Sequence, residues 1–267
     1  PPDQACSESQ CVRRTCTLPT ECGSSRQFSC EAGACFVVGC DDDTDCSDDY
    51  MCGIVGYVGK KPASPIILEG LQRLEYRGYD SAGMSILRGH ELQTRKKKGK
   101  IDEGLAKLIA EHPIEGCIGL GHTRWATHGG PSDENSHPHY DQSGKIAVVH
   151  NGVIENFQRL KDAFKDHTFK SATDTEVLAH LIGAHYETVC AGRKSGASNG
   201  SSELHPLTEA VMNALRDVIG TYGIAVVCAD DPSVVVGARR GSPLVVGIGN
   251  GENFLASDTT AIAAHTR

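Results

Sequence analysis

The 267-residue chain lacks any apolar run near the roughly 18 to 20 residues that a helix needs to cross a bilayer, and it lacks a signal-peptide hydrophobic segment. No membrane partner is therefore expected. Aromatic residues make up only 5% of the chain and none is interleaved with the basic residues 95–100, so no nucleic-acid partner is expected either. An HExxH element is also missing, and the spacing of His137 and His139 around Pro138 does not predict a metal site.

The first 51 residues contain no lysine, no histidine and few large aliphatic side chains. Their ten acidic residues and three arginines carry a net charge of −7 out of −8 for the whole chain, so residues 52–267 are almost neutral. A segment with so little apolar surface cannot fold on a hydrophobic core alone, so cross-links or a metal ion must stabilise it. We expect residues 1–51 to form a small separate unit with little regular structure.

Eight of the twelve cysteines lie in this first segment, and their spacing repeats with steps of 5, 5 and 6 residues. The two copies are offset by 24 residues and consist of Cys6, Cys11, Cys16 and Cys22, followed by Cys30, Cys35, Cys40 and Cys46. An even number of cysteines in a short polar segment predicts four disulfides and an oxidising compartment. Zinc binding is the alternative, but the segment contains no CxxC pair.

Residues 52–267 are rich in Val, Ile, Leu and Ala and alternate between strand and helix patterns. Apolar runs such as 146–149 and 225–227 are typical of strands covered on both faces, which predicts sheets sandwiched by helices. Strands are expected at 54–58, 82–87, 117–122, 146–150, 224–228, 233–238 and 244–248, and helices at 64–76, 101–111, 154–164, 173–186 and 207–219. Residues 95–100 are expected to form a solvated turn, 192–202 a flexible surface insertion and 247–251 a turn between strands.

The sequence Met51-Cys52-Gly53 places a cysteine directly after a methionine, at the start of an apolar strand. A cysteine that becomes the first residue carries its own base, a free α-amine with a pKa of roughly 7.7 to 8.0. Cys52 is therefore a candidate nucleophile. While the bond to Met51 is intact, the nitrogen is an amide and cannot accept a proton, so this hypothesis requires processing or initiation at Met51. The alternative is that Cys52 forms a disulfide with an upstream cysteine.

Three further segments contain residues typical of a small-molecule site. The loop 121–129 holds Arg124, whose guanidinium could clamp a carboxylate or, alternatively, close a turn with neighbouring threonines. Asn151 and Gly152 follow an apolar strand and suit an oxyanion hole, although Asn-Gly is also a common turn. The segment 171–176 is an expected helix N-terminus, where Asp174 or one of the neighbouring hydroxyls could cap the helix. Asp174 could alternatively bind a substrate ammonium.

Five segments resemble the glutaminase domain of the glucosamine-6-phosphate synthase family, one of the class II glutamine amidotransferases. They are CGIVG at 52–56, LEYRGYDSAG at 74–83, HTRWATHG at 122–129, HNG at 150–152 and TDTE at 173–176. Other amidotransferases share the first of these, whereas the second and third are specific to this family. The resemblance covers residues 52–267 apart from 192–202. It implies an α+β fold, the four-layered αββα sandwich of N-terminal-nucleophile hydrolases.

The resemblance also implies a role for each matching residue. Cys52 would attack the side-chain amide of glutamine, its α-amine would carry the proton, and the Asn151 amide and Gly152 N–H would hold the oxyanion. The implied glutamine-binding and gating residues are Arg124 for the α-carboxylate with Thr127 and His128 beside it, Asp174 for the α-ammonium, Trp125 as a gate for ammonia, and Arg77 and His137 near the pocket. No metal or organic cofactor is implied.

The family's chain continues into further glutaminase strands and two sugar-isomerase domains, which bind fructose 6-phosphate and accept the ammonia. Those domains are absent from residues 52–267, so we expect this amidotransferase domain to be incomplete at its C-terminus and to hydrolyse glutamine only. Hexosamine biosynthesis and a homodimer are expected of the full-length enzyme. The family works in the cytoplasm, whereas residues 1–51 alone favour an oxidising compartment.

The upstream segment has three explanations that the sequence leaves open. Residues 1–51 are a cleaved propeptide, a mis-assigned gene start, or part of a real fusion. The first two explanations leave Cys52 free to react. The third predicts a different protein, a secreted cystine-rich binding module fused to an inactive amidotransferase-like domain.

Overall fold

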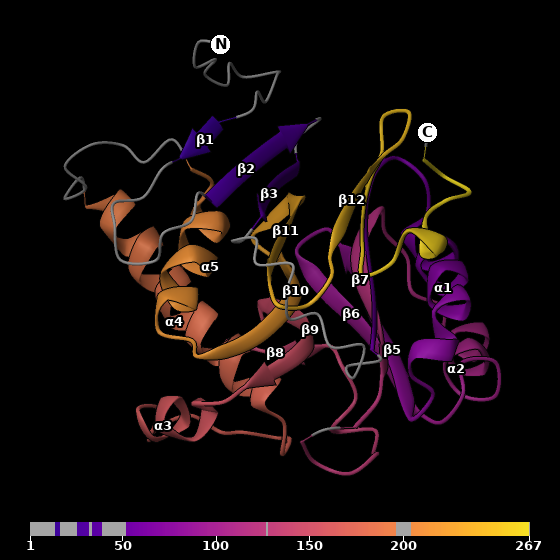
Figure 1. The fold of residues 1–267 in the computed structure, drawn as a ribbon, viewed down its shortest axis with the longest axis horizontal. Coiled ribbons are helices and arrows are strands. Elements are labelled where there is room, and N and C mark those ends of the chain that lie inside the picture. Colours follow the sequence, from indigo (N-terminus) through magenta and orange to yellow (C-terminus); the bar gives the residue numbers. More distant parts are fainter. Residues whose placement is uncertain are drawn as a thin grey trace.

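Two antiparallel sheets lie face to face, and helices cover their outer faces (Figure 1). The computed structural model describes residues 52–126, 128–195 and 204–266, together with the backbone of three short strands nearer the N-terminus. The six-stranded sheet has the order β12-β13-β4-β7-β5-β6, and the four-stranded sheet has the order β11-β10-β9-β8. The nucleophile candidate Cys52 directly precedes β4, in the middle of the larger sheet.

The larger sheet consists of β4 (Gly53–Val58), β5 (Ser81–Arg88), β6 (Glu91–Lys98), β7 (Ile118–Arg124), β12 (Val245–Ile248) and β13 (Asn253–Ala256). The smaller sheet consists of β8 (His139–Tyr140), β9 (Ile146–Ile154), β10 (Gly220–Cys228) and β11 (Asp231–Arg240). The helices are α1 (Ala63–Arg73) and α2 (Leu105–Glu111) beside the larger sheet, α4 (Asp174–Lys194) and α5 (Pro206–Arg216) beside the smaller one, and the short α3 (Phe157–Asp162), η2 (Glu75–Arg77) and η3 (Thr259–Ala261).

Buried apolar side chains fill each gap between the four layers. Strand β9 shows why its sequence is continuously apolar, because its side chains alternate between two cores. Ala147 and Val149 pack between the two sheets, against residues such as Ile54 and Leu120. Val148 points the other way and packs in the core that contains residues of α4 and α5. A third core joins α1 to the larger sheet. The layering is that of the predicted αββα sandwich.

The basic segment 95–100 is not a solvated turn, because most of it belongs to β6, the edge strand that pairs with β5. The prediction was wrong because an edge strand with both faces partly solvated has no apolar alternation to reveal it. Lys96 is half-buried, and its Nζ donates to the carbonyl oxygens of Glu134 and Pro138 at 3.1 and 3.3 Å. Burial lowers the pKa of Lys96 to about 8.

Other parts of the structure also differ from the expectations. The helix predicted at 154–164 is shorter, because Ile154 ends β9 and α3 spans only Phe157–Asp162. Helix α4 continues to Lys194, beyond the predicted start of the insertion at residue 192, and residues 196–203 lie outside the described residues. Strands β8 and β13 were not predicted. They have two and four residues, which is too short for an alternation of apolar and polar residues to show in the sequence. The turn predicted at 247–251 is confirmed, since it joins β12 to β13.

Near the N-terminus, β1 (Arg14–Cys16), β2 (Arg26–Glu31) and β3 (Ala34–Val38) form a three-stranded antiparallel sheet. Cys30 and Cys35 are opposite each other in the β2–β3 register. The disulfides predicted for residues 1–51 lie outside the described side chains. Across the described helices, none combines the length and the apolar character that a membrane span requires.

Candidate active site

Cys52 directly precedes the first residue of β4 and is almost completely buried, with 8% of its surface exposed. The backbone N–H of Trp125 donates to Cys52 Sγ at 3.2 Å. Burial raises the pKa of the Cys52 thiol to about 11, although the Trp125 hydrogen bond and the nearby Arg124 and Arg77 charges oppose this shift. The thiol is therefore protonated near neutral pH. It needs a base to become a nucleophile.

Asn151 comes from β9 in the other sheet, and its side chain reaches across to Cys52. Its Nδ2 donates to the backbone carbonyl of Cys52 at 3.0 Å, and Asn151 is buried. The two residues are 99 positions apart in the chain. Stacking of the two sheets brings the predicted nucleophile and the predicted oxyanion-hole amide together.

Gly152 follows Asn151 and has a left-handed φ of +120°. A Cβ atom on Gly152 would lie 2.3 Å from the carbonyl oxygen of Thr221 on the neighbouring strand β10. Only glycine fits this backbone, because both the dihedral angle and the space exclude a side chain.

We expect Gly152→Ala to lower the free energy of unfolding by roughly 2 to 4 kcal/mol, since it adds a backbone clash to an unfavourable φ. Gly144→Ala is the matched control, because Gly144 also has a positive φ (+73°) but a Cβ atom there would meet no other atom within 4 Å. Gly144→Ala should lower the free energy of unfolding by only about 1 kcal/mol. Urea unfolding of both variants measures the difference, and equal losses would contradict the steric explanation.

Arg124 ends β7 and is buried, with 4% of its surface exposed. Its Nη2 donates to the carbonyl oxygens of His128 and, at 2.9 Å, Gly129, which closes the loop that follows β7. Its Nη1 is buried and has no hydrogen-bond partner among the described residues. Burial lowers the pKa of Arg124, and the charges of Cys52, Asp174 and Asp80 act in the opposite direction. Arg124 thus closes the loop through backbone carbonyl oxygens, and its Nη1 amino group remains for an anionic ligand.

Asp174 lies in the first turn of α4 and is buried. It does not cap the helix: the N-cap is Thr173, whose side chain accepts from the Glu176 N–H. The Asp174 carboxylate accepts instead from Ile154 N at 2.8 Å and Thr175 N at 3.0 Å. These two bonds hold the carboxylate in place.

Trp125 covers the thiol with its backbone and extends its indole outward. The side chain is 40% exposed and stands edge-on to Tyr79, with ring centroids 5.3 Å apart. Arg77 donates from Nε to the Cys52 carbonyl at 3.2 Å and pairs with Asp258 at 3.3 Å. Arg77 therefore helps to hold the backbone of the nucleophile.

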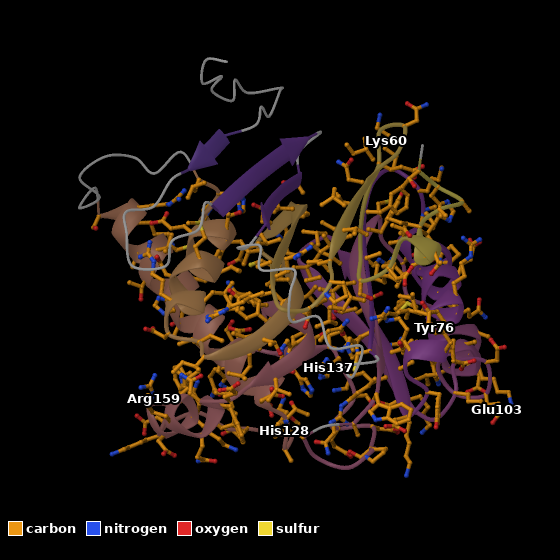
Figure 2. The ribbon with its side chains drawn as sticks, viewed as in Figure 1. Lys60, Tyr76, Glu103, His128, His137 and Arg159 are labelled. Atoms are coloured by element: carbon orange, nitrogen blue, oxygen red, sulfur yellow. The ribbon has the colours of Figure 1, made fainter. Side chains whose placement is uncertain are left out.

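Two other predicted residues, His128 and His137, have described surroundings. His128 stacks edge-on against Phe157 and its buried Nδ1 has no hydrogen-bond partner among the described residues. Thr127 lies outside the described residues. Figure 2 labels His128 and His137 between the two halves of the molecule. His137 accepts a hydrogen bond from the backbone N–H of His150 at 3.3 Å, and its ring stacks on His122.

The sequence interpretation missed a role for three of the four histidines buried here. We call these four residues the histidine cluster: His122, His137, His139 and His150. Burial lowers the pKa of each ring, and that of His122 falls to about 3. His122 lies in β7, where every residue is buried, and only the folded structure shows this burial. In the described ranges, no three His, Cys, Asp or Glu side chains are arranged to hold a metal ion.

Comparisons with known proteins agree with this geometry. Residues 109–197 match the family described as glutamine amidotransferase domain. The glutamine phosphoribosylpyrophosphate amidotransferase of B. subtilis has a similar structure, with a TM-score of 0.63 and 27% identity over 80% of this chain and 44% of its own. The structure of an allosteric regulatory enzyme of purine biosynthesis is also similar, with a TM-score of 0.65 and 28% identity over 80% of this chain and 44% of its own. The chain therefore carries a glutamine amidotransferase domain with the N-terminal-nucleophile hydrolase fold.

Two proteins with more similar sequences bear the same name. The chain is 51% identical over 219 residues to glutamine–fructose-6-phosphate aminotransferase (isomerising) of Caldanaerobacter subterraneus. The aligned residues cover 81% of this chain and 33% of that protein. The enzyme of the same name from Streptomyces coelicolor is 51% identical over 220 residues, with the same coverage. The domain is homologous to these enzymes and spans about a third of their length. This agrees with the family that the sequence motifs indicated.

Proposed function

We propose that this chain hydrolyses the side-chain amide of glutamine at Cys52 and supplies the ammonia for making glucosamine 6-phosphate. The observation that carries the proposal is that a buried thiol, an amide donor and a buried arginine with an unpartnered Nη1 lie together. These groups belong to Cys52, Asn151 and Arg124. Homology to enzymes named glutamine–fructose-6-phosphate aminotransferase supports the choice of substrate.

Arg124 and Asp174 carry charges opposite to those of the α-carboxylate and the α-ammonium of glutamine. The α-carboxylate would accept from the free Nη1 of Arg124, a charge-assisted bond in a buried site. The α-ammonium would bind the Asp174 carboxylate, which backbone N–H groups already orient. His128 and Thr127 follow Arg124 in the same loop and would complete this end of the pocket.

The chemical step uses groups at the other end of the substrate. The thiol proton passes to the α-amine of a free Cys52, and the sulfur attacks the amide carbon. The oxyanion is held by Asn151 Nδ2 and the Gly152 N–H; Nδ2 has two hydrogens, of which the Cys52 carbonyl takes one. The protonated α-amine of Cys52 then returns the proton to the amide nitrogen of the substrate as the C–N bond breaks. Ammonia departs past Trp125. Water cleaves the thioester to glutamate and restores the thiol.

The remaining parts of the proposal concern the rest of the enzyme. Residues 52–267 would form the amidotransferase domain, and residues 1–51 a separate segment that must be removed or bypassed to free the Cys52 amine. Fructose 6-phosphate would be bound by isomerase domains of the longer protein, which would work as a homodimer in the cytoplasm.

The test uses a chain prepared to begin at Cys52. We expect it to release glutamate and ammonia from glutamine, and Cys52→Ala to lower the rate by roughly 10³-fold or more. A glutamine analogue with a diazoketone in place of the amide should add one equivalent to Cys52 by peptide mass spectrometry, and excess glutamine should slow that labelling. Cys117→Ala is the matched control, because Cys117 is exposed and outside the site. Hydrolysis that survives Cys52→Ala would refute the proposal.

A further inference from the structure

His122 lies directly behind the amide of Asn151. The imidazole is completely buried on β7, and its Nε2 is 2.9 Å from Asn151 Oδ1. The same nitrogen is 3.0 Å from the backbone carbonyl oxygen of His150. His122 therefore contacts the Oδ1 end of the Asn151 amide, and the Nδ2 end bonds the Cys52 carbonyl.

The hydrogen-bond partners determine which atoms carry hydrogens. One end of the Asn151 amide lies 3.0 Å from the Cys52 carbonyl, which can only accept, so this end is the NH₂ group. The other end is then the oxygen, and it needs a donor. His122 Nε2 must carry the proton, because both of its neighbours are acceptors. The opposite nitrogen, Nδ1, is buried without a partner among the described residues, as expected of a bare lone pair.

We propose that His122, as the neutral Nε2–H tautomer, is the positioning residue that orients the Asn151 amide so that its NH₂ group stays on the side of Cys52, where it can donate to the oxyanion. The inference deepens the proposed function and rests on it. An Asn side chain can rotate by half a turn at little steric cost. Such a rotation would present Oδ1 to the oxyanion and turn a stabilising donor into a repulsive acceptor. The His122 proton opposes that rotation because it bonds only to the oxygen end.

The surroundings of His122 hold the ring in this state. Its face stacks on His137, with ring centroids 4.2 Å apart. His137 is itself anchored, since its Nδ1 accepts from the His150 N–H. Burial, together with the charges of Arg124 and His150, lowers the pKa of His122 to about 3 against the opposing effect of its hydrogen bonds to Asn151 and to the His150 backbone. The ring is thus neutral at any pH at which the thiol chemistry would run.

Two variants of the chain beginning at Cys52 test the proposal. His122→Leu keeps a similar volume but removes the donor, and we expect it to lower kcat roughly 10²-fold with KM changed less than about 3-fold, because the groups that bind the α-carboxylate and α-ammonium are untouched. His122→Gln places an amide N–H near the position of Nε2, and it should recover most of kcat. Equal kcat losses in the two variants, or a loss confined to KM, would overturn the positioning role.

The Asn151→Ala background provides a second test. If His122 acts through Asn151, adding His122→Leu to Asn151→Ala should lower kcat no further, so the effects are not additive. A full additional loss in the double variant would show a general structural role and overturn the proposal.

A measurement on the unsubstituted chain does not depend on any variant folding. The ¹⁵N spectrum of histidine-labelled protein should show His122 protonated at Nε2 and bare at Nδ1 near neutral pH. The opposite tautomer or an imidazolium would overturn the proposal. Failure of the proposed function is distinguishable, because then the unsubstituted chain shows no Cys52-dependent glutamine hydrolysis whatever the tautomer of His122.

Discussion

A chain that keeps residues 1–51 is expected to hydrolyse glutamine roughly 10² to 10⁴ times more slowly than one that begins at Cys52, the usual contribution of a general base. The reason lies in the surroundings of the thiol. Burial holds the pKa of Cys52 at about 11, so almost no thiolate forms near neutral pH without a base. In the longer chain the adjacent nitrogen is an amide and cannot take the proton.

The pH dependence of kcat/KM separates a missing base from other causes. The chain beginning at Cys52 should gain activity as the pH rises through roughly 8, where an α-amine loses its proton. The longer chain should gain activity only at much higher pH, toward the pKa of the thiol itself. A chain beginning at Met51, with that methionine retained, is the matched control. It moves the amine by one residue without the bulk of the upstream segment, and it should be as slow as the full chain. Comparable rates in all three chains would contradict the amine-as-base mechanism.

Lowering the pH from 7 to 5 is expected to destabilise the fold strongly, because the histidine cluster is buried in its neutral form. An unfolded histidine takes up a proton near a pKa of about 6.5, whereas His122 in the folded state does so only near 3. His137, His139 and His150 are shifted in the same direction by burial. The stability that these rings contribute is therefore complete above the unfolded pKa and is lost as the pH falls toward the folded values.

Each such ring removes roughly 1.4 kcal/mol of unfolding free energy per pH unit once the pH is well below 6.5. Urea unfolding at pH 7, 6 and 5 measures the slope. His139→Gln deletes one buried ring, which bonds to Thr173. It should therefore reduce the slope by about 1.4 kcal/mol per pH unit, the contribution of one proton. His112→Gln, at an exposed position, is the control and should leave the slope unchanged. A stability that stays flat from pH 7 to 5 would contradict the prediction.

Local patterns were sufficient to predict much of the fold. The long apolar strands β7, β9 and β10 and the helices α1, α4 and α5 were each recognisable, because their side-chain period extends over several residues. Edge and short strands were not. β6 is basic and half-solvated, and β8 has two residues, so their strand character comes from pairing with β5 and β9.

The site shows the same division. The sequence alone identified Cys52, Arg124, Asn151 and Asp174 as chemically distinctive, because residue type and neighbours mark them: a thiol after methionine, an arginine in a polar loop, an amide before glycine and an acid at a helix start. It could not show that Thr173, one residue away, caps α4 and leaves the Asp174 carboxylate for other bonds. It also could not assign a role to His122, whose importance depends on a partner 29 positions away.

Residue chemistry, short-range spacing and the family motifs, then, were enough to single out the candidate reacting groups and to predict the layered α+β architecture. No single segment of the sequence showed that these groups lie together in space. The two sheets stack through a shared apolar core, and this places β9 against the start of β4 and buries the thiol, the amide and the guanidinium together. The raised pKa of Cys52 and the lowered pKa of His122 follow from that burial, since desolvation is a property of the packed molecule and not of the residue.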